Sequence, residues 1–571
     1  MNKEQAELRR WLEEVTDSEL SAELLSIRNE ESEVHDRFYR SLEFGTAGLR
    51  GELGAGTNRM NIYTVRQATK GFAAYLLTQS KSPKAAISYD SRHKSETFAR
   101  ETARVLAANG VKVYLYPCLM PTPALSFAVL DRHCEGGVMI TASHNPARYN
   151  GYKAYAADGA QISGEVAAAV SAEIEKTDLF HDVRLVDFEE ALADGRIEYI
   201  DDALIERYYA AVMAQALRPQ LGRKAGLRLV YTPLNGSGLV PVMTVLKRMG
   251  HTDITVVPEQ EKPNGDFPTC PYPNPEILEA MQLGLNLCEK LGADLLLATD
   301  PDSDRVGTAV LQNGVPRLIS GNEMGALLLD YICRTRLELH KMPEHPVAVR
   351  SIVSTTMTDA IAAHYGVEMR QVLTGFKYIG EQIAHLEAEG HPERFLFGFE
   401  ESYGYLAGGY VRDKDAVVAS MLICEMAAWY KGQGKNIGKA LDDLYAQYGY
   451  YFNKVDSYTF PGSDGMEKMA SLMQKLRTET PFVLAGRAVT GHTDYQAGFR
   501  YEDGKGKTPT GLPASNVMEF RLGAEGSVVA RPSGTEPKLK IYYSLRAAER
   551  AAAEKAYDEI KASVENLLGL A

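Results

Sequence analysis

Short apolar segments alternate with helical patterns along most of this chain, and this rhythm limits its fold more than any other feature. The first round runs from AAISYD (85–90) through the amphipathic segment 95–110 to GGVMITAS (136–143). Strand-like segments separated by helical ones predict an α/β domain with a largely parallel or mixed sheet. The rhythm recurs over 227–305 and 346–404, so we predict three similar domains, although no strict sequence period is visible.

The two ends of the chain do not follow this rhythm. Apolar residues recur at helical spacing near the N-terminus, at Leu8, Trp11, Leu12 and Val15, which predicts a helical extension. After residue 450, strand-like segments and a final amphipathic helix predict a smaller α+β domain. The expected fold class is therefore α/β, with mixed sheets in three similar domains and an α+β C-terminal domain. The expected boundaries are 1–40, 41–205, 206–325, 326–450 and 451–571.

The charge balance argues against nucleic acid and membrane surfaces as partners. The chain has 62 basic and 75 acidic residues and a net charge of −13, which disfavours a general grip on polyanions. We find no run of about 18 apolar residues that would span a membrane and no apolar stretch typical of a signal peptide. Six cysteines without a CxxC pair fit a reducing compartment. We expect a cytoplasmic protein that is a monomer or a weak dimer.

Three carboxylates directly follow one apolar segment. The loop DPDSDR, after LLLA, places Asp300, Asp302 and Asp304 at alternate positions ahead of Arg305. Carboxylates this close repel one another unless a cation neutralises them, and hard oxygen ligands suit Mg²⁺. A solvated acidic turn is the alternative, but the buried strand before the loop favours a functional site. The sequence therefore predicts that these three aspartates bind Mg²⁺.

A phosphate-binding loop is indicated near the C-terminus. RPSGTEPK (531–538) offers the guanidinium of Arg531, the hydroxyls of Ser533 and Thr535, and backbone amides around Gly534. Together these groups can cradle a phosphate dianion, although the pattern is not that of a Walker loop. A plain Pro-Ser-Gly turn with an unrelated arginine explains the same residues, and the loop alone favours neither interpretation.

Two further loops carry polar residues where apolar segments end. Glu400 and Ser402 in GFEESYG suit the vicinal hydroxyls of a sugar, or else form a plain turn. TGFKYIG, with Thr374, Gly375 and Lys377, closes a strand-like segment (368–380) ahead of a helix that we expect over 381–389. A lysine among apolar residues needs a partner, unless its stem packs there and its charge reaches solvent. Open α/β sheets bind ligands beyond the carboxyl ends of their strands, so both loops are candidates for substrate binding.

Ser143 in TASHNPARYNGYK has three interpretations, as a hydrolase nucleophile, a phosphate-carrying serine or a helix N-cap. The GxSxG pattern of a hydrolase elbow is absent. We also expect the adjacent side chains of Ser143 and His144 to diverge at a strand end, which would prevent a nucleophile–base pair. A phosphoserine beside Mg²⁺ that hands its phosphoryl group to a sugar hydroxyl explains the serine, the acidic loop and the phosphate loop together.

The chain resembles the α-D-phosphohexomutases, the phosphoglucomutase and phosphomannomutase enzymes, over nearly all of its length after residue 40. The resemblance rests on six motifs in order, which are FGTAGLRG (44–51), TASHNPARYNGYK (141–153), DPDSDR (300–305), TGFKYIG (374–380), GFEESYG (398–404) and RPSGTEPK (531–538). The first motif and the length are similar to the branch that holds bacterial α-phosphoglucomutases and animal phosphoglucomutase/phosphopentomutase proteins. The family implies three α/β domains and a smaller fourth around a central cleft.

The resemblance implies a role for each candidate residue. Ser143 would carry the phosphoryl group and ligate the metal through it, beside the three aspartates of the acidic loop. Lys153 would be the general acid/base, Arg50 would lie near the transferring group, and Arg305 would orient the phosphoserine. His144 is placed in the active site without a proton-transfer role, with a structural role as the alternative. Glu400 and Ser402 would read the sugar hydroxyls, and the loop 531–535 would grip the phosphate that is not reacting.

The implied reaction interconverts glucose 1-phosphate and glucose 6-phosphate through glucose 1,6-bisphosphate, which also serves as an activator. A phosphopentomutase, a phosphomannomutase and a glucose 1,6-bisphosphate synthase could use the same residues. A non-catalytic phosphosugar sensor is disfavoured because the serine and the acidic ligands are intact, and an alkaline-phosphatase-like hydrolase would need a second, histidine-rich metal cluster.

The chain departs from the family pattern at two sites. Tyr403-Gly404 stands where phosphomannomutase/phosphoglucomutase relatives often have Gly-His, which leans away from the dual mannose/glucose branch. Asn235 stands where many relatives have a histidine, and the sequence does not explain that change.

Overall fold

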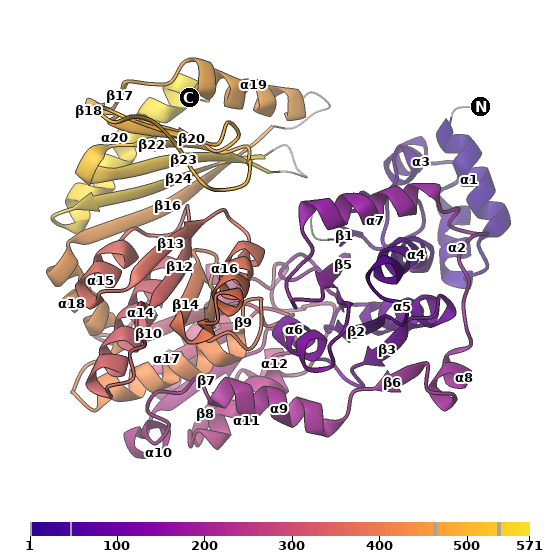
Figure 1. The fold of residues 1–571 in the computed structure, drawn as a ribbon, viewed down its shortest axis with the longest axis horizontal. Helices are drawn as coiled ribbons and strands as arrows, with labels where there is room; N and C mark the ends of the chain where they lie inside the picture. The colour runs from indigo at the N-terminus through magenta and orange to yellow at the C-terminus, as the bar shows by residue number, and fades with distance from the viewer. Residues whose placement is uncertain (1–2, 46–47, 461–464, 534–537, 571) are drawn as a thin grey trace. The chain divides into compact units, whose positions relative to one another are not determined.

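The computed structural model describes residues 3–45, 48–460, 465–533 and 538–570, and these form two compact units (Figure 1). One unit comprises the chain up to Ser320 together with Ile379–Phe397 and Tyr403–Asn436. The other comprises Gly321–Tyr378, Gly398–Ser402 and the chain from Ile437 onward. Among the described residues, no helix combines the length and apolarity needed to cross a bilayer.

The helical N-terminal extension consists of three short helices, α1 (Lys3–Glu14), α2 (Ser18–Ile27) and α3 (Glu31–Phe38). Asp17 separates the first two, because its carboxylate accepts hydrogen bonds from the backbone N–H groups at the start of α2 and so caps that helix. Trp11 is fully buried and packs edge-on against Phe38 and Tyr63. Since Tyr63 belongs to α4 (Ile62–Gln79), this aromatic cluster anchors the extension on the first α/β domain.

The first α/β domain has a six-stranded mixed sheet in the order β1-β5-β4-β2-β3-β6. Strands β2, β3, β4 and β6 run parallel, whereas β5 is antiparallel to both β4 and β1. Helices α4, α5 and α7 share one hydrophobic core with this sheet. The elements are β1 (Gly48–Glu52), α4 (Ile62–Gln79), β2 (Lys84–Tyr89), α5 (Ser95–Ala108), β3 (Lys112–Leu115), α6 (Thr122–Asp131), β4 (Gly136–Ile140), β5 (Tyr149–Ala156), α7 (Gly164–Lys176), α8 (Phe188–Ala193), β6 (Ile197–Tyr199) and α9 (Asp202–Met213).

The second α/β domain has a five-stranded sheet in the order β11-β10-β9-β7-β8. Strand β7 runs parallel to β8 and β9, and β10 is antiparallel to β9 and β11, so this sheet is also mixed. The elements are α10 (Leu221–Ala225), β7 (Arg228–Thr232), α11 (Leu239–Arg248), β8 (Asp253–Val256), α12 (Pro258–Glu261), α13 (Leu278–Leu291), β9 (Leu295–Thr299), β10 (Val306–Gln312) and β11 (Val315–Ile319). The acidic loop joins β9, which is buried along its whole length, to β10.

The third α/β segment corrects one prediction, because residues 376–380 are helical and not strand-like. Gly375 has a φ of 126°, which ends the extended chain. The buried residues Phe376, Ile379 and Ile383 then recur at helical spacing, so α16 begins five residues before the predicted 381. The elements are α14 (Gly321–Glu338), β12 (Val347–Ser351), α15 (Met357–Tyr365), β13 (Glu368–Val372), α16 (Phe376–Ala388), η1 (Pro392–Arg394), β14 (Phe395–Glu400), β15 (Gly404–Ala407), α17 (Ala416–Lys431) and α18 (Ile437–Tyr448).

The C-terminal domain is built on a seven-stranded sheet in the order β16-β24-β23-β22-β19-β20-β21, in which every neighbouring pair is antiparallel. Helices α19 and α20 pack on one face of this sheet (Figure 1). The elements are β16 (Tyr450–Thr459), α19 (Gly465–Thr478), β17 (Val483–Leu484), β18 (Arg487–Ala488), β19 (Gly491–Asp494), β20 (Phe499–Glu502), β21 (Gly506–Pro509), β22 (Met518–Arg521), η2 (Gly523–Glu525), β23 (Gly526–Pro532), β24 (Lys538–Ala547) and α20 (Arg550–Leu568).

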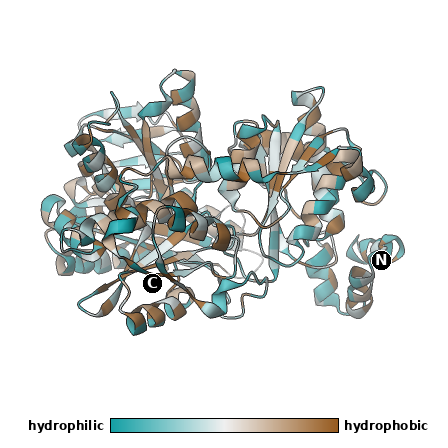
Figure 2. Cartoon of the chain, turned by 90° about the horizontal axis from the view of Figure 1, so that it is seen from below, coloured by the Kyte–Doolittle hydropathy of each residue, from teal (hydrophilic) through white to brown (hydrophobic). Residues whose placement is uncertain are grey.

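Most helices bury one side and expose the other, as the brown and teal residues along them show in Figure 2, whereas α17 is buried along nearly its whole length. The predicted fold class is confirmed, with three α/β domains that carry mixed sheets and an antiparallel C-terminal domain.

A buried histidine in the second domain makes the stability of the protein depend on pH. His251 is 3% exposed, and its Nδ1 atom has no hydrogen-bond partner among the described residues. Burial lowers the pKa of His251 from 6.5 to about 4. The unfolded chain therefore binds a proton between these values that the folded chain does not, so stability falls as the pH drops through this window. At pH 5 the loss should be about 2 kcal/mol relative to pH 7.5.

Urea unfolding at pH 7.5 and pH 5 measures this loss. The substitution His251→Leu should remove the part of the stability difference between the two pH values that comes from His251, since leucine does not bind a proton. If the pH dependence of the variant equals that of the wild type, His251 is not its source.

Candidate active site

Ser143 lies in the loop between β4 and β5, in a conformation fixed by its neighbours. Its φ is 51°, in the left-handed region that non-glycine residues rarely adopt. Its backbone N–H donates to Thr141 Oγ1 at 2.7 Å, and the Thr141 hydroxyl in turn donates to Asp90 Oδ2 at 2.6 Å. This chain of buried hydrogen bonds compensates the cost of the unusual backbone.

Arg92 holds the same loop from the other side. Its side chain is fully buried, and its guanidinium donates to the backbone carbonyl oxygens of Ser143, Asn145, Pro146 and Tyr149. One planar cation with fixed donors thereby ties four points of a short segment together. The serine is presented on a rigid loop.

The acidic loop meets this serine within the same unit. Ser143 Oγ donates to Asp300 Oδ2 at 2.9 Å, and the other oxygen of Asp300 accepts from the backbone N–H groups of Asp304 and Arg305 at 3.1 and 3.0 Å. All three aspartates are essentially buried. One carboxylate oxygen from each lies within 4.8 Å of the others.

Lys153 Nζ reaches the same carboxylates, at 2.7 Å from Asp302 Oδ2 and 3.5 Å from Asp304 Oδ2. Burial raises the pKa of Asp300 well above its usual range, and the charges of Asp302 and Asp304 add to this rise. Burial also opposes the ionised form of Asp302, but the Lys153 ammonium outweighs it and holds that pKa below its usual value. Burial opposes the charged form of Lys153 as well, yet Asp302 and Asp304 keep its pKa above the usual value. The three carboxyl groups therefore compete for positive charge, and the ionised form of Asp300 is the one most disfavoured.

The donor set fits a hard divalent cation. Asp302 Oδ1 and Asp304 Oδ1 are buried and have no hydrogen-bond partner among the described residues. Buried oxygens of this kind are costly unless a ligand satisfies them. Carboxylate oxygens alone, with no sulfur or imidazole among the three clustered groups, are the ligands preferred by Mg²⁺.

Two arginines and one histidine border the serine. Arg50 donates to Asn145 Oδ1 at 3.3 Å, and Arg305 forms an ion pair with Glu276. The pKa of His144 lies well below its usual range, because of burial first and then of the positive charges of Arg305 and Arg50. His144 is therefore neutral at physiological pH.

The expectation that the Ser143 and His144 side chains diverge is wrong. Ser143 Oγ lies 3.2 Å from His144 Nδ1. Divergence holds for neighbours in an extended strand, whereas the positive φ of Ser143 turns the chain between the two residues. The two side chains consequently sit on the same side.

Sequence reasoning missed a second lysine in this cluster. Lys414 Nζ lies 3.2 Å from Asp304 Oδ2 and 3.1 Å from Asp413 Oδ1, and Asp413 also accepts from Tyr155 at 2.7 Å. The signal was the run RDKD (412–415), four charged residues directly ahead of a largely apolar helix. All four are buried, and charges are rarely buried without a structural or catalytic reason.

Asn235, unexplained by the sequence, has a structural role in the second domain. Its φ of 57° lies in the left-handed region that asparagine tolerates well. Its side-chain amide donates to the carbonyl oxygens of Lys262 at 2.8 Å and Glu259 at 3.3 Å. The residue thus closes a tight turn and ties it to α12 and to the residue that follows this helix.

The candidate sugar-binding residues lie in the other unit. Glu400 Oε1 accepts from the backbone N–H of Gly375 at 2.7 Å, so the two predicted loops meet. Lys377 lies in the first turn of α16, with its Nζ 5.2 Å from the centre of the Tyr378 ring. Thr374 directly precedes Gly375 in the chain, and Ser402 lies two residues after Glu400. Ser402 is followed by Tyr403, whose φ is 65°.

The candidate phosphate loop is described only in part. Arg531 is the sixth residue of β23 and pairs with Lys540 of β24, and the Ser533 N–H donates to the Lys538 carbonyl at 2.7 Å. Gly534 and Thr535 lie outside the described residues.

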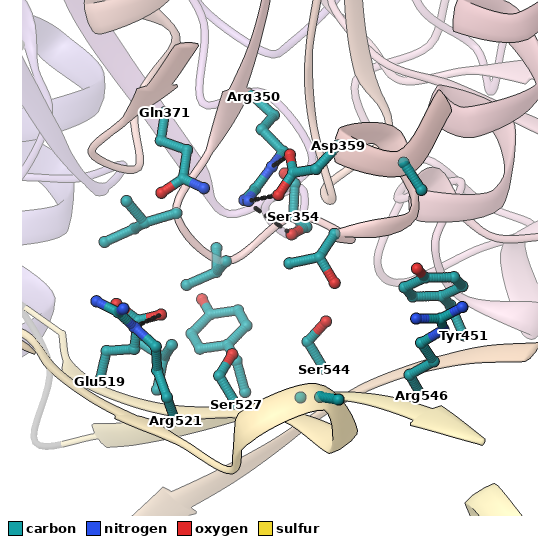
Figure 3. A pocket seen from close by; sticks show the side chains of 18 of the residues that line it. Arg350, Ser354, Asp359, Gln371, Tyr451, Glu519, Arg521, Ser527, Ser544 and Arg546 are labelled. Carbon is teal, nitrogen blue, oxygen red and sulfur yellow. Dashed lines mark hydrogen bonds and ion pairs between the residues drawn. The ribbon is translucent and has the colours of Figure 1, made fainter. Parts of the chain in front are cut away.

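A cavity of about 410 Å³ in this unit lies between the loop after β12 and the sheet face opposite α19 and α20 (Figure 3). Arg350 on one wall is held by Asp359 through two hydrogen bonds of 2.7 Å, and Arg521 and Arg546 stand on the other. The described residues that line it include none of the candidate substrate residues, so we give it no part in the reaction.

Comparison with known proteins agrees with the motifs. Four models of the phosphoglucomutase/phosphomannomutase family match the chain, with α/β/α domains I, II and III at residues 41–180, 206–313 and 320–448 and the C-terminal domain at 496–561. A phosphoglucomutase from Staphylococcus haemolyticus is 38% identical over 513 residues, which cover 89% of this chain and 91% of the relative.

Two solved structures share the fold. The Paramecium phosphoglucomutase pp63/parafusin has a TM-score of 0.70 at 16% identity, covering 92% of this chain and 96% of that one. An N-acetylphosphoglucosamine mutase from Aspergillus fumigatus has a TM-score of 0.50 at 15% identity, covering 93% and 96%. The matched domains and the identity to the staphylococcal relative settle the family. The chain belongs to the α-D-phosphohexomutases, the phosphoglucomutase/phosphomannomutase family, and is a phosphosugar mutase of the isomerase class.

Proposed function

We propose that this mutase is an α-phosphoglucomutase, which interconverts glucose 1-phosphate and glucose 6-phosphate through a phosphoserine at Ser143 and a glucose 1,6-bisphosphate intermediate. The observation that carries the proposal is the contact of Ser143 Oγ with Asp300 at 2.9 Å, inside a buried cluster of three carboxylates and two lysines. A hydroxyl held there is placed to carry a phosphoryl group beside a cation. The relatives named phosphoglucomutase support glucose as the sugar.

Asp300, Asp302 and Asp304 would hold Mg²⁺, which when bound supplies positive charge beside the oxygens of the transferring phosphoryl group. The Aspergillus fumigatus relative was solved with GlcNAc-6P and magnesium, which supports this choice of metal. Arg305 would orient the phosphoserine, and Arg50 would lie near the transferring group. Glucose 1,6-bisphosphate would act as the activator, because it can phosphorylate Ser143 directly.

Lys153 is the proposed proton carrier. In the first transfer the bond between phosphorus and Ser143 Oγ breaks while the C6 hydroxyl oxygen of glucose 1-phosphate bonds to the phosphorus. Lys153 gives its proton to the serine oxygen and takes the proton that the sugar hydroxyl loses, so that protons balance. The second transfer repeats these steps in reverse with the phosphate on C1. The raised pKa of Lys153 keeps it protonated at the start of the cycle.

The remaining candidates would bind substrate. We assign the binding of the sugar hydroxyls to Glu400 and Ser402. Gly375 is joined to Glu400 by a hydrogen bond, and Thr374 and Lys377, which lie near Gly375 in sequence, are assigned to the same site. The phosphate that is not reacting is assigned to Arg531, Ser533, Gly534 and Thr535. In this division residues 41–205 supply the serine, 206–325 the metal loop, 326–450 the sugar loop and 451–571 the phosphate loop.

A coupled rate assay over glucose, mannose, N-acetylglucosamine and ribose 1-phosphates, with Mg²⁺ and a trace of glucose 1,6-bisphosphate, tests the substrate. We expect kcat/KM for glucose 1-phosphate to exceed the others by at least about 10-fold, the scale of discrimination that one or two polar contacts provide. If ribose 1-phosphate gives the highest value, the serine chemistry stands and the assignment to glucose is wrong.

A further inference from the structure

The first turn of α6 grips the acidic loop at two points. The backbone N–H of Thr122 donates to the carbonyl oxygen of Asp302 at 2.9 Å, and its hydroxyl donates to Asp302 Oδ2 at 2.8 Å. Thr122 is fully buried. Since Thr122 belongs to the first α/β domain and Asp302 to the second, this residue fixes the metal loop against the domain that carries Ser143.

The two oxygens of the Asp302 carboxylate are not equivalent. Oδ2 accepts from Thr122 Oγ1 and from Lys153 Nζ at 2.7 Å, whereas Oδ1 is buried and has no hydrogen-bond partner among the described residues. A half-turn of the carboxylate only exchanges its two chemically identical oxygens, whereas any smaller rotation would weaken or break both hydrogen bonds. The donors therefore fix the plane of the carboxylate and so the position of the second oxygen, which is the one offered to a cation.

Of the two donors, only Thr122 can keep this role through a catalytic cycle. Lys153 is the proposed proton carrier, and its ammonium also reaches Asp304 at 3.5 Å. A cation beside Asp302 repels that ammonium. The threonine hydroxyl is neutral, short and tied down by its own backbone N–H, so it stays in place whatever the charge of the lysine.

We propose that Thr122 is a positioning residue for the metal site, which sets the orientation of Asp302 and so the affinity for the divalent cation. The proposal rests on the proposed function, because it takes the acidic loop to be the metal site. It adds a residue from outside the six motifs, on an element that none of them includes.

Mn²⁺ binding, followed by electron paramagnetic resonance of the free ion, tests the proposal on the full chain. Thr122→Val removes the hydroxyl at nearly constant shape and should raise the dissociation constant for Mn²⁺ by about 10- to 100-fold, the usual effect of losing a partner of a metal ligand. Thr122→Ser keeps the hydroxyl and should bind Mn²⁺ as the wild type does. With Mg²⁺ at saturation, the valine variant should regain most of its kcat, since only the affinity is lost.

Thr69→Val is the matched control. The Thr69 hydroxyl is also fully buried and donates a hydrogen bond, but to the Val65 carbonyl within α4. This variant should leave Mn²⁺ affinity unchanged. If valine at position 122 prevents folding, Thr122→Cys replaces it, because a thiol is only a weak donor.

The outcomes separate this proposal from the proposed function. Suppose first that Asp302→Asn weakens Mn²⁺ binding. If Thr122→Val then binds Mn²⁺ as the wild type does, or if Thr122→Ser binds it as weakly as Thr122→Val, the role of the Thr122 hydroxyl is overturned and the proposed function stands. If the wild type binds no Mn²⁺, or Asp302→Asn binds as the wild type does, the acidic loop is not the metal site and both proposals fail.

Discussion

Replacing Ser143 with alanine should lower kcat by more than about 1,000-fold, the largest effect expected of any single substitution in this protein. The reason is that carrying the phosphoryl group needs a hydroxyl at this place. In the described part of the cluster, Ser143 Oγ is the side-chain hydroxyl that contacts Asp300. Steady-state turnover of glucose 1-phosphate, with glucose 1,6-bisphosphate present, measures the loss. The fold should survive, since alanine keeps the backbone N–H that donates to Thr141.

Ser91→Ala is the control for this experiment. The Ser91 hydroxyl is buried in the same domain and has no hydrogen-bond partner among the described residues, so its removal should leave turnover within about twofold. Incubation with labelled glucose 1,6-bisphosphate should label the wild type and the control but not Ser143→Ala. A variant without Ser143 that keeps substantial turnover would show that the phosphoryl group is carried elsewhere.

Removal of divalent cations should lower turnover by at least about 100-fold, with recovery on addition of Mg²⁺. Among the buried carboxylates of the acidic loop, Asp302 pairs with Lys153, and Asp304 pairs with Lys153 and Lys414. Without a cation, the buried oxygens Asp302 Oδ1 and Asp304 Oδ1 have no hydrogen-bond partner among the described residues. Dialysis against a chelator, followed by titration with Mg²⁺, measures the effect.

Asp304→Asn should require a higher Mg²⁺ concentration for half-maximal rate, whereas Asp253→Asn should not, because Asp253 is exposed and pairs only with Arg228 among the described residues. Full activity in the chelated wild type would contradict a metal requirement. Equal Mg²⁺ dependence of the two variants would place the metal away from the acidic loop.

Much of the fold could be read from the sequence because strands, helices and loops follow separate local patterns. The acidic loop was found because it directly follows a strand, β9, that is apolar and buried throughout. The helix α16 was placed too late because TGFKYIG is strand-like in composition, and only the positive φ of Gly375 reveals where the helix begins. The break between α1 and α2 depends on Asp17. Its side chain caps the start of α2, although the sequence pattern there would also fit a continuous helix.

Contacts between distant segments were out of reach. Lys414 approaches Asp304 from 110 positions further along the chain and Thr122 approaches Asp302 from 180 positions before it, and no local pattern pairs such residues. The approach of Ser143 to His144 was misjudged for the opposite reason, since a single backbone angle decides it. The charged run at 412–415 gave a usable signal, because burial of four consecutive charged residues demands partners.

The antiparallel pairing of β5 places Lys153 opposite Met139 on one side and Gly48 on the other. In such a strand the parity of a residue's position decides the face on which its side chain emerges. An insertion of one residue between Tyr149 and Tyr152 would therefore turn the lysine to the opposite face, although every residue type of the site remained present. Even a two-residue insertion, which restores the face, would move the lysine by about 7 Å along the strand. Lineages of this enzyme must therefore keep the length of both the strand and the loop before it, which carries Ser143 and is held by Arg92.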